Sequence, residues 1–345
     1  MKIALVSDAW VPQVNGVVRT LQQMLKMLRD DGHTVEVISP DRFYTLPCPG
    51  YAEIRLAVAP WQLSQFMDEF APEAVHIATE GPLGWAARRW CKRRGVTFNS
   101  SFHTRFPDYV AARTGISPDW VWPLMRRFHA PSNRVLVATQ GLGEELETHG
   151  ITRTHRWTRG VDLTRFAPDK PLHPAFEGLA YPIQLYVGRV AVEKNIEAFL
   201  DNLHAGSKVV VGDGPALEAL RARYPQVTFT GALAGDELAS AYASADVFVF
   251  PSLTDTFGLV MIEALASGVP VAGFPVHGPL DIVGRDGRGT VEGFSDLIGA
   301  VNDDLAVAIA AALRCSPDDC VAYARHYSWD KSYQQFFSAV SALAA

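Results

Sequence analysis

The sequence predicts an α/β protein made of two doubly wound parallel sheets. Short apolar, β-rich runs alternate with segments of helical period along the chain. The alternation stops in a polar, proline-bearing stretch near 160–180 and then begins again. At 345 residues the chain is also longer than one ordinary core fills. Strands that alternate with helices form a parallel sheet covered on both faces, so we expect two such domains.

The expected elements follow this alternation in order. In the first half, strands are predicted within 2–8, 33–39, 74–78, 96–103 and 134–139, with helices at 17–31, 81–95 and 141–149. In the second half, strands are predicted within 183–190, 207–214, 227–233, 246–252 and 269–275. The last segment, 327–345, has helical period with aromatic residues on one face, and we expect it to pack back across the joint.

Composition excludes several classes of protein. With 48% hydrophobic and 20% charged residues, and no apolar run of the ~20 residues that a membrane span needs, the chain is expected to be a globular cytoplasmic protein. The opening "MKIALVSD" is expected to be a first strand and not a signal peptide. The 4 cysteines are scattered and lack zinc-finger spacing, so free thiols are expected.

Charge is distributed unevenly between the two halves. Residues 1–165 hold 20 Lys and Arg against 16 Asp and Glu, a net +4, whereas residues 166–345 hold 11 against 21, a net −10. Two basic segments with tryptophans, at 88–94 and 126–127, favour contact with an anionic membrane surface. A solvated helix face is the alternative. The overall acidity and the absence of a nucleic-acid fold signal argue against nucleic acid.

Ligands of open parallel sheets bind beyond the carboxyl ends of the strands, so the loops after strands carry the candidate site. Gly16 follows the first strand and can begin a helix that approaches a phosphate. Arg189 and Lys194 follow the strand that opens the second half, where two cations suit a diphosphate. Gly188 and Gly212 lie in turns after strands. Plain turn glycines and a solvated basic loop are the alternatives.

"TDTFGLVMIEALASGVP" places Asp255 before an apolar helix and Glu263 inside it. Burying a carboxylate is costly unless it meets hydrogen-bond donors, and the two hydroxyls of a ribose are suitable donors. The alternative is a capping acid followed by an exposed glutamate.

Several motifs together resemble one known family. "GRVAVEKN", "VGDGP", "PSLTDTFGLVMIEALASGVPV" and "GPLDIV" are similar to the donor-binding domain of the retaining GT-B glycosyltransferases of family four. "NGVVRT" and "SFHTRFPDY" resemble the family's N-terminal loops, and "RGVDLTRFAP" its interdomain segment. The resemblance spans nearly the whole chain and is strongest to sulfoquinovosyl-diacylglycerol synthases, glycolipid-forming transferases and GDP-mannose-dependent α-mannosyltransferases.

The resemblance implies an architecture. Two Rossmann-like domains would face a central cleft, with an acceptor-binding domain at 1–165, a donor-binding domain at 166–326, and a C-terminal helix at 327–345 that returns to the N-terminal domain.

It also implies roles for individual residues. Arg189 and Lys194 match the pair that binds the donor diphosphate, Glu263 the ribose-binding acid, and Asp255 the acid that contacts the donor sugar, where most of the family has glutamate. The other donor-side positions are Gly16, Gly188, Gly212, Phe257, Gly258 and Leu259.

On the acceptor side, His103 matches the histidine that contacts the 6-position of the sugar. Thr104, Arg105, Asp108 and Tyr109 would line the acceptor pocket. No Asp-x-Asp motif follows a strand, so we expect catalysis without a metal or other cofactor, the helix N-terminus and the cations stabilising the leaving group.

The expected function is therefore transfer of a hexose, with α linkage, from a UDP- or GDP-linked sugar to a hydroxyl of a membrane glycerolipid or other lipid, at the inner face of the cytoplasmic membrane. One alternative is a GDP-mannose-dependent α-mannosyltransferase with a soluble or oligosaccharide acceptor. An alternative of a different class is a non-catalytic nucleotide-sugar-binding protein, or a phosphorylase or epimerase with the same fold.

Overall fold

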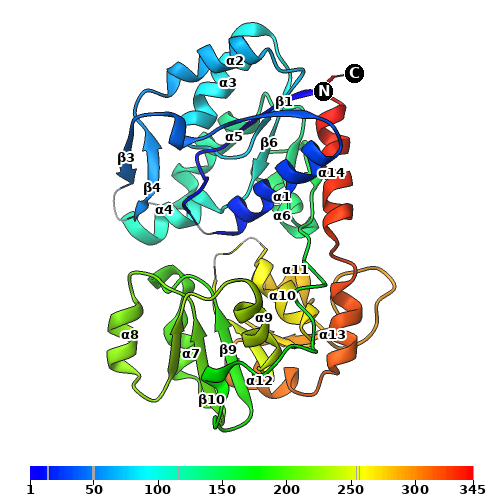
Figure 1. Cartoon of the computed structure of the whole chain (residues 1–345). Coiled ribbons are helices and arrows are strands. Elements are labelled where there is room, and N and C mark those ends of the chain that lie inside the picture. Colours follow the sequence, from blue (N-terminus) through cyan, green and yellow to red (C-terminus); the bar gives the residue numbers. More distant parts are fainter. Residues whose placement is uncertain (14, 49–50, 116, 254, 256, 345) are drawn as a thin grey trace. The chain divides into compact units, whose positions relative to one another are not determined.

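The computed structural model describes residues 1–13, 15–48, 51–115, 117–253, 255 and 257–344; the side chains of 51–53, 109 and 112–114 are also outside the description. The chain forms two compact units (Figure 1). The first unit holds Met1–Arg159 and Asp330–Ala345, and the second holds Gly160–Trp329. The division therefore falls between Arg159 and Gly160, and not after residue 165 as expected from the sequence.

The first unit is built on a six-stranded sheet with the order β2-β1-β5-β6-β7-β8, in which all neighbours run parallel. Its strands are β1 (Lys2–Val6), β2 (Thr34–Ile38), β5 (Ala74–Ile77), β6 (Phe98–Phe102), β7 (Val135–Val137) and β8 (Thr154–Arg156). Its helices are α1 (Gly16–Asp30), α2 (Leu63–Phe70), α3 (Pro82–Arg94), α4 (Phe106–Thr114), α5 (Trp122–His129), α6 (Gln140–Thr148) and α14 (Trp329–Ser341).

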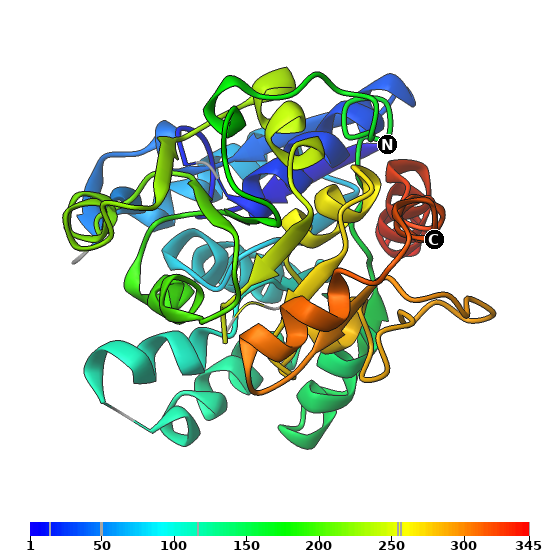
Figure 2. The same ribbon diagram turned by 90° about the horizontal axis from the view of Figure 1, so that it is seen from below.

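The second unit repeats this plan with the order β11-β10-β9-β12-β13-β14, again parallel throughout. Its strands are β9 (Ile183–Val187), β10 (Ser207–Val211), β11 (Thr228–Gly231), β12 (Val247–Phe250), β13 (Val271–Gly273) and β14 (Gly299–Val301). Its helices are α7 (Ile196–Asp201), α8 (Leu217–Arg223), α9 (Gly235–Ala243), α10 (Leu259–Ala266), α11 (Pro279–Ile282), α12 (Leu305–Ala312) and α13 (Pro317–Ala324). Figure 2 shows the orange helices α12 and α13 beside the yellow part of this unit, where α12 contacts β13 and α13 contacts α10.

Every strand expected from the sequence is present, and the described residues form four more. β3 (Thr45–Cys48) and β4 (Tyr51–Ala57) form an antiparallel pair outside the main sheet. β8 and β14 have only three residues each, at the edges of the two sheets. β8 has the sequence Thr-His-Arg and so lacks the apolar run by which the equally short β7 and β13 were recognised.

Helix α1 illustrates why the predicted elements form. The side chain of Asn15 caps the helix by accepting a hydrogen bond from the Val18 amide at 3.0 Å. Val18, Leu21 and Leu28 are buried at helical spacing, so one face of the helix packs against the sheet.

The C-terminal helix α14 packs on the first unit, as expected from its aromatic face. Phe336 is fully buried, and its ring centroid lies 4.8 Å from that of Trp157. The Trp157 indole donates to Ser332 Oγ at 3.1 Å, and the Asn99 amide donates to the Ala339 carbonyl at 2.7 Å. Residues 327–329, which we expected to begin this helix's domain, belong instead to the second unit.

Candidate functional site

The loop after β9 carries the two cations expected to bind a diphosphate. Lys194 ends a single 3-10 turn, Val192–Lys194, and Arg189 precedes it. The Tyr186 hydroxyl donates to the Arg189 carbonyl at 2.8 Å. Asn195 adopts the left-handed conformation, with φ 53°, and its side chain donates to the Pro251 carbonyl at 3.1 Å. The loop is thereby fixed to the end of β12.

Lys194 lies against the first of the two acids. Its ammonium donates to both carboxylate oxygens of Asp255, at 2.6 and 2.8 Å. Both side chains are about a quarter exposed, at 24% and 27%. Arg189 has a nitrogen 4.0 Å from a carboxylate oxygen of Glu193. The structure therefore brings Lys194 and Asp255 together at the carboxyl ends of β9 and β12.

The same carboxylates act on a buried tyrosine. Burial raises the pKa of Tyr186 well above its ordinary value, and the charges of Asp255 and Glu193 raise it further. Tyr186 therefore stays a neutral hydroxyl that can donate to the Arg189 carbonyl at any ordinary pH.

The second acid, Glu263, points into the protein. It lies inside α10, is 3% exposed, and accepts a hydrogen bond from the Tyr242 hydroxyl at 3.0 Å. The expectation that this carboxylate is buried is met. Such burial requires hydrogen-bond donors, and Tyr242 on α9 supplies one.

Helix α10 begins between Asp255 and Glu263, as expected from the sequence. Leu259 is its first residue, and Gly258 precedes it with φ 79°. A Cβ at Gly258 would lie 3.0 Å from the Phe250 ring. Phe257 is buried, with its ring centroid 6.1 Å from that of Tyr327. Thr254 and Thr256, in the same loop, lie outside the described residues.

The expected donor-side glycines have packing reasons of their own. A Cβ at Gly212 would lie 1.8 Å from the Gly188 carbonyl oxygen, and one at Gly188 would lie 2.8 Å from the Tyr186 hydroxyl. The backbones of the loops after β9 and β10 thus lie in close contact at Gly188 and Gly212, with no room for a side chain at Gly212. Gly16 is the first residue of α1 in the other unit. Its place at a helix start agrees with the sequence.

His103 follows β6 in the first unit and is 8% exposed. Its Nδ1 accepts a hydrogen bond from Nη2 of Arg159 at 2.8 Å. Burial lowers the pKa of His103 well below 6.5, and the charges of Arg159 and His76 lower it further. Burial also lowers the pKa of Arg159, to about 9. His103 is therefore a neutral imidazole.

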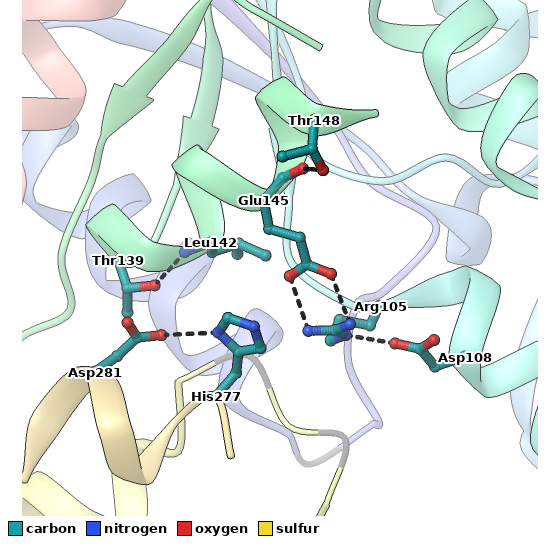
Figure 3. Close-up of polar contacts among 8 residues, drawn as sticks. All are labelled: Arg105, Asp108, Thr139, Leu142, Glu145, Thr148, His277 and Asp281. Atoms are coloured by element: carbon teal, nitrogen blue, oxygen red, sulfur yellow. Dashed lines mark hydrogen bonds and ion pairs between the residues drawn. The ribbon is translucent and has the colours of Figure 1, made fainter. Parts of the chain in front are cut away.

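The expected acceptor-side residues are partly engaged with one another. Figure 3 shows the Arg105 guanidinium reaching the carboxylates of Asp108 and Glu145. Its contacts with Glu145 are 2.8 and 2.6 Å long. Thr104 is exposed, whereas Tyr109 lies on α4 with its side chain outside the described part. The positive charge of Arg105 is thus balanced by two acids, and the sequence had singled out only Asp108.

Sequence reasoning gave no role to three further residues, one in the first unit and two in the second. Arg159 lies in the quoted motif "RGVDLTRFAP" but was given no role, and Asn195 directly follows Lys194. His277 precedes α11 and lies 3.7 Å from the Asp281 carboxylate (Figure 3). The motif "GPLDIV", directly after His277, was the available signal.

The two basic segments are neighbours in the first unit, but not all of their cations point outward. Arg88 donates to the carbonyls of Phe128 and Arg127, at 2.9 and 2.6 Å, and so joins α3 to α5. A groove of about 420 Å³ lies between α2 and α3. Its lining includes three tryptophans, three arginines and one acid: Trp61, Trp85, Trp90, Arg89, Arg93, Arg94 and Asp68. Trp61 is 67% exposed, and Trp120, before α5, is 81% exposed.

Neither a cluster of metal-binding side chains nor a membrane-spanning helix occurs in the described part of the chain. No group of three or more His, Cys, Asp or Glu side chains gathers there as a metal site would require. Within the same residues, no helix has the length and apolar character needed to span a bilayer.

Two family models match the chain. Residues 14–165 match the model described as Glycosyltransferase Family 4, and residues 181–315 match the model described as Glycosyl transferases group 1.

Individual relatives agree with the family models. A GDP-mannose-dependent α-mannosyltransferase of Mycobacterium tuberculosis is 34% identical over 310 residues, which are 82% of this chain and 81% of the relative. An α-monoglucosyldiacylglycerol synthase of Streptococcus pneumoniae is 27% identical over 79% of this chain and 70% of the relative. Among solved structures, a sucrose-phosphate synthase of Thermosynechococcus elongatus has a TM-score of 0.77 at 22% identity, covering 99% of this chain and 98% of that one.

Proposed function

The chain belongs to glycosyltransferase family 4, and from this premise we propose that it is a retaining enzyme that transfers a hexose, with α linkage, to a membrane glycerolipid. The donor would be a UDP- or GDP-linked sugar. The observation that carries the proposal is the contact of Lys194 with Asp255 beside the loop of Arg189, within the unit that also buries Glu263.

Each donor-side residue would bind a different part of the nucleotide sugar. Lys194 and Arg189 would bind the diphosphate and stabilise the charge of the departing nucleotide, together with the amino end of α10. Glu263 would accept hydrogen bonds from the ribose hydroxyls. Asp255 would contact the sugar after the diphosphate has replaced it as the partner of the Lys194 ammonium. We propose that this set acts without a metal, the leaving group being stabilised by cations of the chain itself.

The acceptor side would supply orientation. His103 is neutral and buried, so it suits a hydrogen bond to a sugar hydroxyl better than proton transfer. In the account that the family resemblance implies, an oxygen of the donor phosphate receives the acceptor's proton. Arg105, Asp108 and Glu145 would line the acceptor pocket.

A glycerolipid acceptor is supported by the surface of the first unit. The exposed Trp61 in the groove that Arg89, Arg93 and Arg94 also line combines an apolar contact with positive charge, as an anionic bilayer surface requires. The diacylglycerol named for the Streptococcus pneumoniae relative points to the same acceptor class. We propose that the enzyme binds the membrane peripherally through this face.

Vesicle flotation tests the membrane contact. The wild type should float with vesicles of anionic phospholipid, and Trp61→Ser combined with Arg93→Glu should remain in the aqueous fraction. Arg221→Glu, an exposed arginine of α8, is the matched control and should float like the wild type. Equal flotation of all three proteins would contradict the proposal that this face binds the membrane.

The main alternative is the same retaining sugar transfer with a different donor and a different acceptor. The Mycobacterium tuberculosis relative is named for GDP-mannose, so a mannosyl donor with a soluble or oligosaccharide acceptor is the second candidate. Transfer from UDP-glucose, UDP-galactose and GDP-mannose to diacylglycerol and to mannose oligosaccharides, measured in parallel, separates the two.

The same assay tests transfer itself. His103→Ala and Lys194→Ala should each lose most activity, while Arg221→Ala keeps it. Unchanged activity in both variants would overturn the mechanism, and binding of nucleotide sugar without any transfer would favour the non-catalytic alternative.

A further inference from the structure

We propose that Arg159 is a positioning residue for His103, whose ring it holds with the proton on Nε2, so that His103 presents an N–H donor to the substrate. The assignment of a substrate to His103 rests on the proposed function. The positioning itself rests on the contacts of Arg159.

The direction of the hydrogen bond fixes the tautomer. A guanidinium has only donors, and Nη2 of Arg159 lies 2.8 Å from Nδ1 of His103. Nδ1 must therefore offer a lone pair. Because a neutral imidazole carries its single proton on the other nitrogen, Nε2 is an N–H donor.

Arg159 is itself held in one orientation. Its Nη1 donates to the Trp157 carbonyl at 2.7 Å, and the guanidinium carbon lies 4.5 Å from the Trp157 ring centroid. The His103 ring meets the same indole at a centroid distance of 5.5 Å. The guanidinium, the indole and the imidazole thus form one packed cluster.

The burial of Arg159 is not explained by a contribution to the stability of the fold. The residue is 5% exposed, and among the described residues no carboxylate pairs with it. Burying a cation without an anion costs free energy. An arginine at this position is explained by its action on His103.

The charges around His103 favour the neutral ring. Arg159 is positive, and His76, which is fully buried, faces the same cluster with its Nε2 2.9 Å from Ser101 Oγ. Burial and the Arg159 charge both disfavour the imidazolium. His103 therefore keeps one proton and one tautomer across the neutral range.

Nitrogen NMR of the whole chain labelled at histidine tests the tautomer without any activity assay. His103 is assigned by the resonances lost in His103→Gln. In the wild type, Nδ1 should show the shift of an unprotonated ring nitrogen and Nε2 that of a protonated one. In Arg159→Met the two tautomers should mix, and Arg159→Lys, which keeps a donor, should restore part of the preference. A wild-type proton on Nδ1, or the same tautomer in Arg159→Met, would overturn the proposal.

A double-mutant cycle tests whether Arg159 acts through His103. Arg159→Met should lower kcat by about tenfold to 100-fold in the wild-type background, because it releases a positioned contact. It should have little further effect in the His103→Gln background. An equal loss in both backgrounds would mean that Arg159 acts independently of His103, which contradicts the proposal.

The controls separate positioning from folding and from the proposed function. Nucleotide affinity, which the proposed function assigns mainly to residues of the second unit, should be the same in wild type and Arg159→Met. Arg156→Met removes an exposed arginine three residues earlier and should change neither kcat nor the tautomer. If no donor and acceptor pair is ever turned over, the proposed function fails while the NMR result still decides the positioning.

Discussion

The Lys194 ammonium contacts both carboxylate oxygens of Asp255, at 2.6 and 2.8 Å. A nucleoside diphosphate that binds Lys194 must therefore compete with this carboxylate. The competition is feasible because both side chains are partly exposed and water screens their attraction.

Asp255→Asn should separate nucleotide binding from transfer. With the competing charge removed, free UDP or GDP should bind at least as tightly as in the wild type, as measured by titration calorimetry. Transfer should fall by about tenfold or more, because the proposed contact of Asp255 with the sugar would be lost. Glu218→Gln, an exposed acid of α8, is the control. Weaker nucleotide binding in Asp255→Asn would contradict this account.

Gly212→Ala should damage the donor-side loops. Its Cβ would lie 1.8 Å from the Gly188 carbonyl oxygen, so the loops after β9 and β10 must separate. We expect a loss of about 2–3 kcal/mol in the free energy of unfolding, together with weaker nucleotide binding. Gly143→Ala, whose nearest contact would be 3.4 Å, should be close to neutral. Denaturant unfolding of both variants checks this, and equal stability would refute it.

Asp8 is predicted to hold the start of α3. Its carboxylate accepts from the Leu83 and Gly84 amides at 2.8 and 3.2 Å, and from the Thr79 hydroxyl at 2.9 Å. Asp8→Ala leaves these buried donors without an acceptor and should cost about 1–3 kcal/mol of folding free energy. Asp8→Asn should cost less because its amide oxygen still accepts. If Asp8→Ala unfolds at the wild-type denaturant concentration, the carboxylate is not needed for α3.

Buried histidines should make the first unit sensitive to acid. Burial lowers the pKa of His76 to about 3, with a smaller contribution from the Arg159 charge. Between that value and the ordinary value near 6.5, the unfolded chain binds more protons, so stability falls as pH falls. From pH 7 to 5 this one residue should cost about 2 kcal/mol.

His76→Gln checks this dependence, since it should lose less stability than the wild type over that interval in denaturant unfolding at each pH. Asp8 acts in the opposite direction, because burial raises its pKa to about 6. The comparison between variant and wild type cancels that contribution. Parallel pH dependences would contradict the prediction.

The sequence predicted the features that local pattern and spacing encode. The apolar run around Glu263 indicated a helix with an inward carboxylate, and the motif "GRVAVEKN" indicated cations after a strand; both are present in the structure. It could not predict that Lys194 and Asp255, which are 61 positions apart, would pair. Nor could it predict the contact of Arg159 with His103, because that contact depends on how β6 and the segment after β8 are placed in space. The pairing of β3 with β4 was missed because it lies outside the alternating pattern.

The most direct test of the central claim concerns the ribose. Glu263 is expected to accept hydrogen bonds from the ribose hydroxyls, and each hydrogen bond to a charged group contributes about 1.5–3 kcal/mol. Calorimetry should therefore show that the wild type binds UDP or GDP about tenfold or more tightly than the corresponding 2′,3′-dideoxy nucleotide. In Glu263→Gln this preference should shrink sharply. Equal affinity of the wild type for the ribo and dideoxy nucleotides would contradict the account.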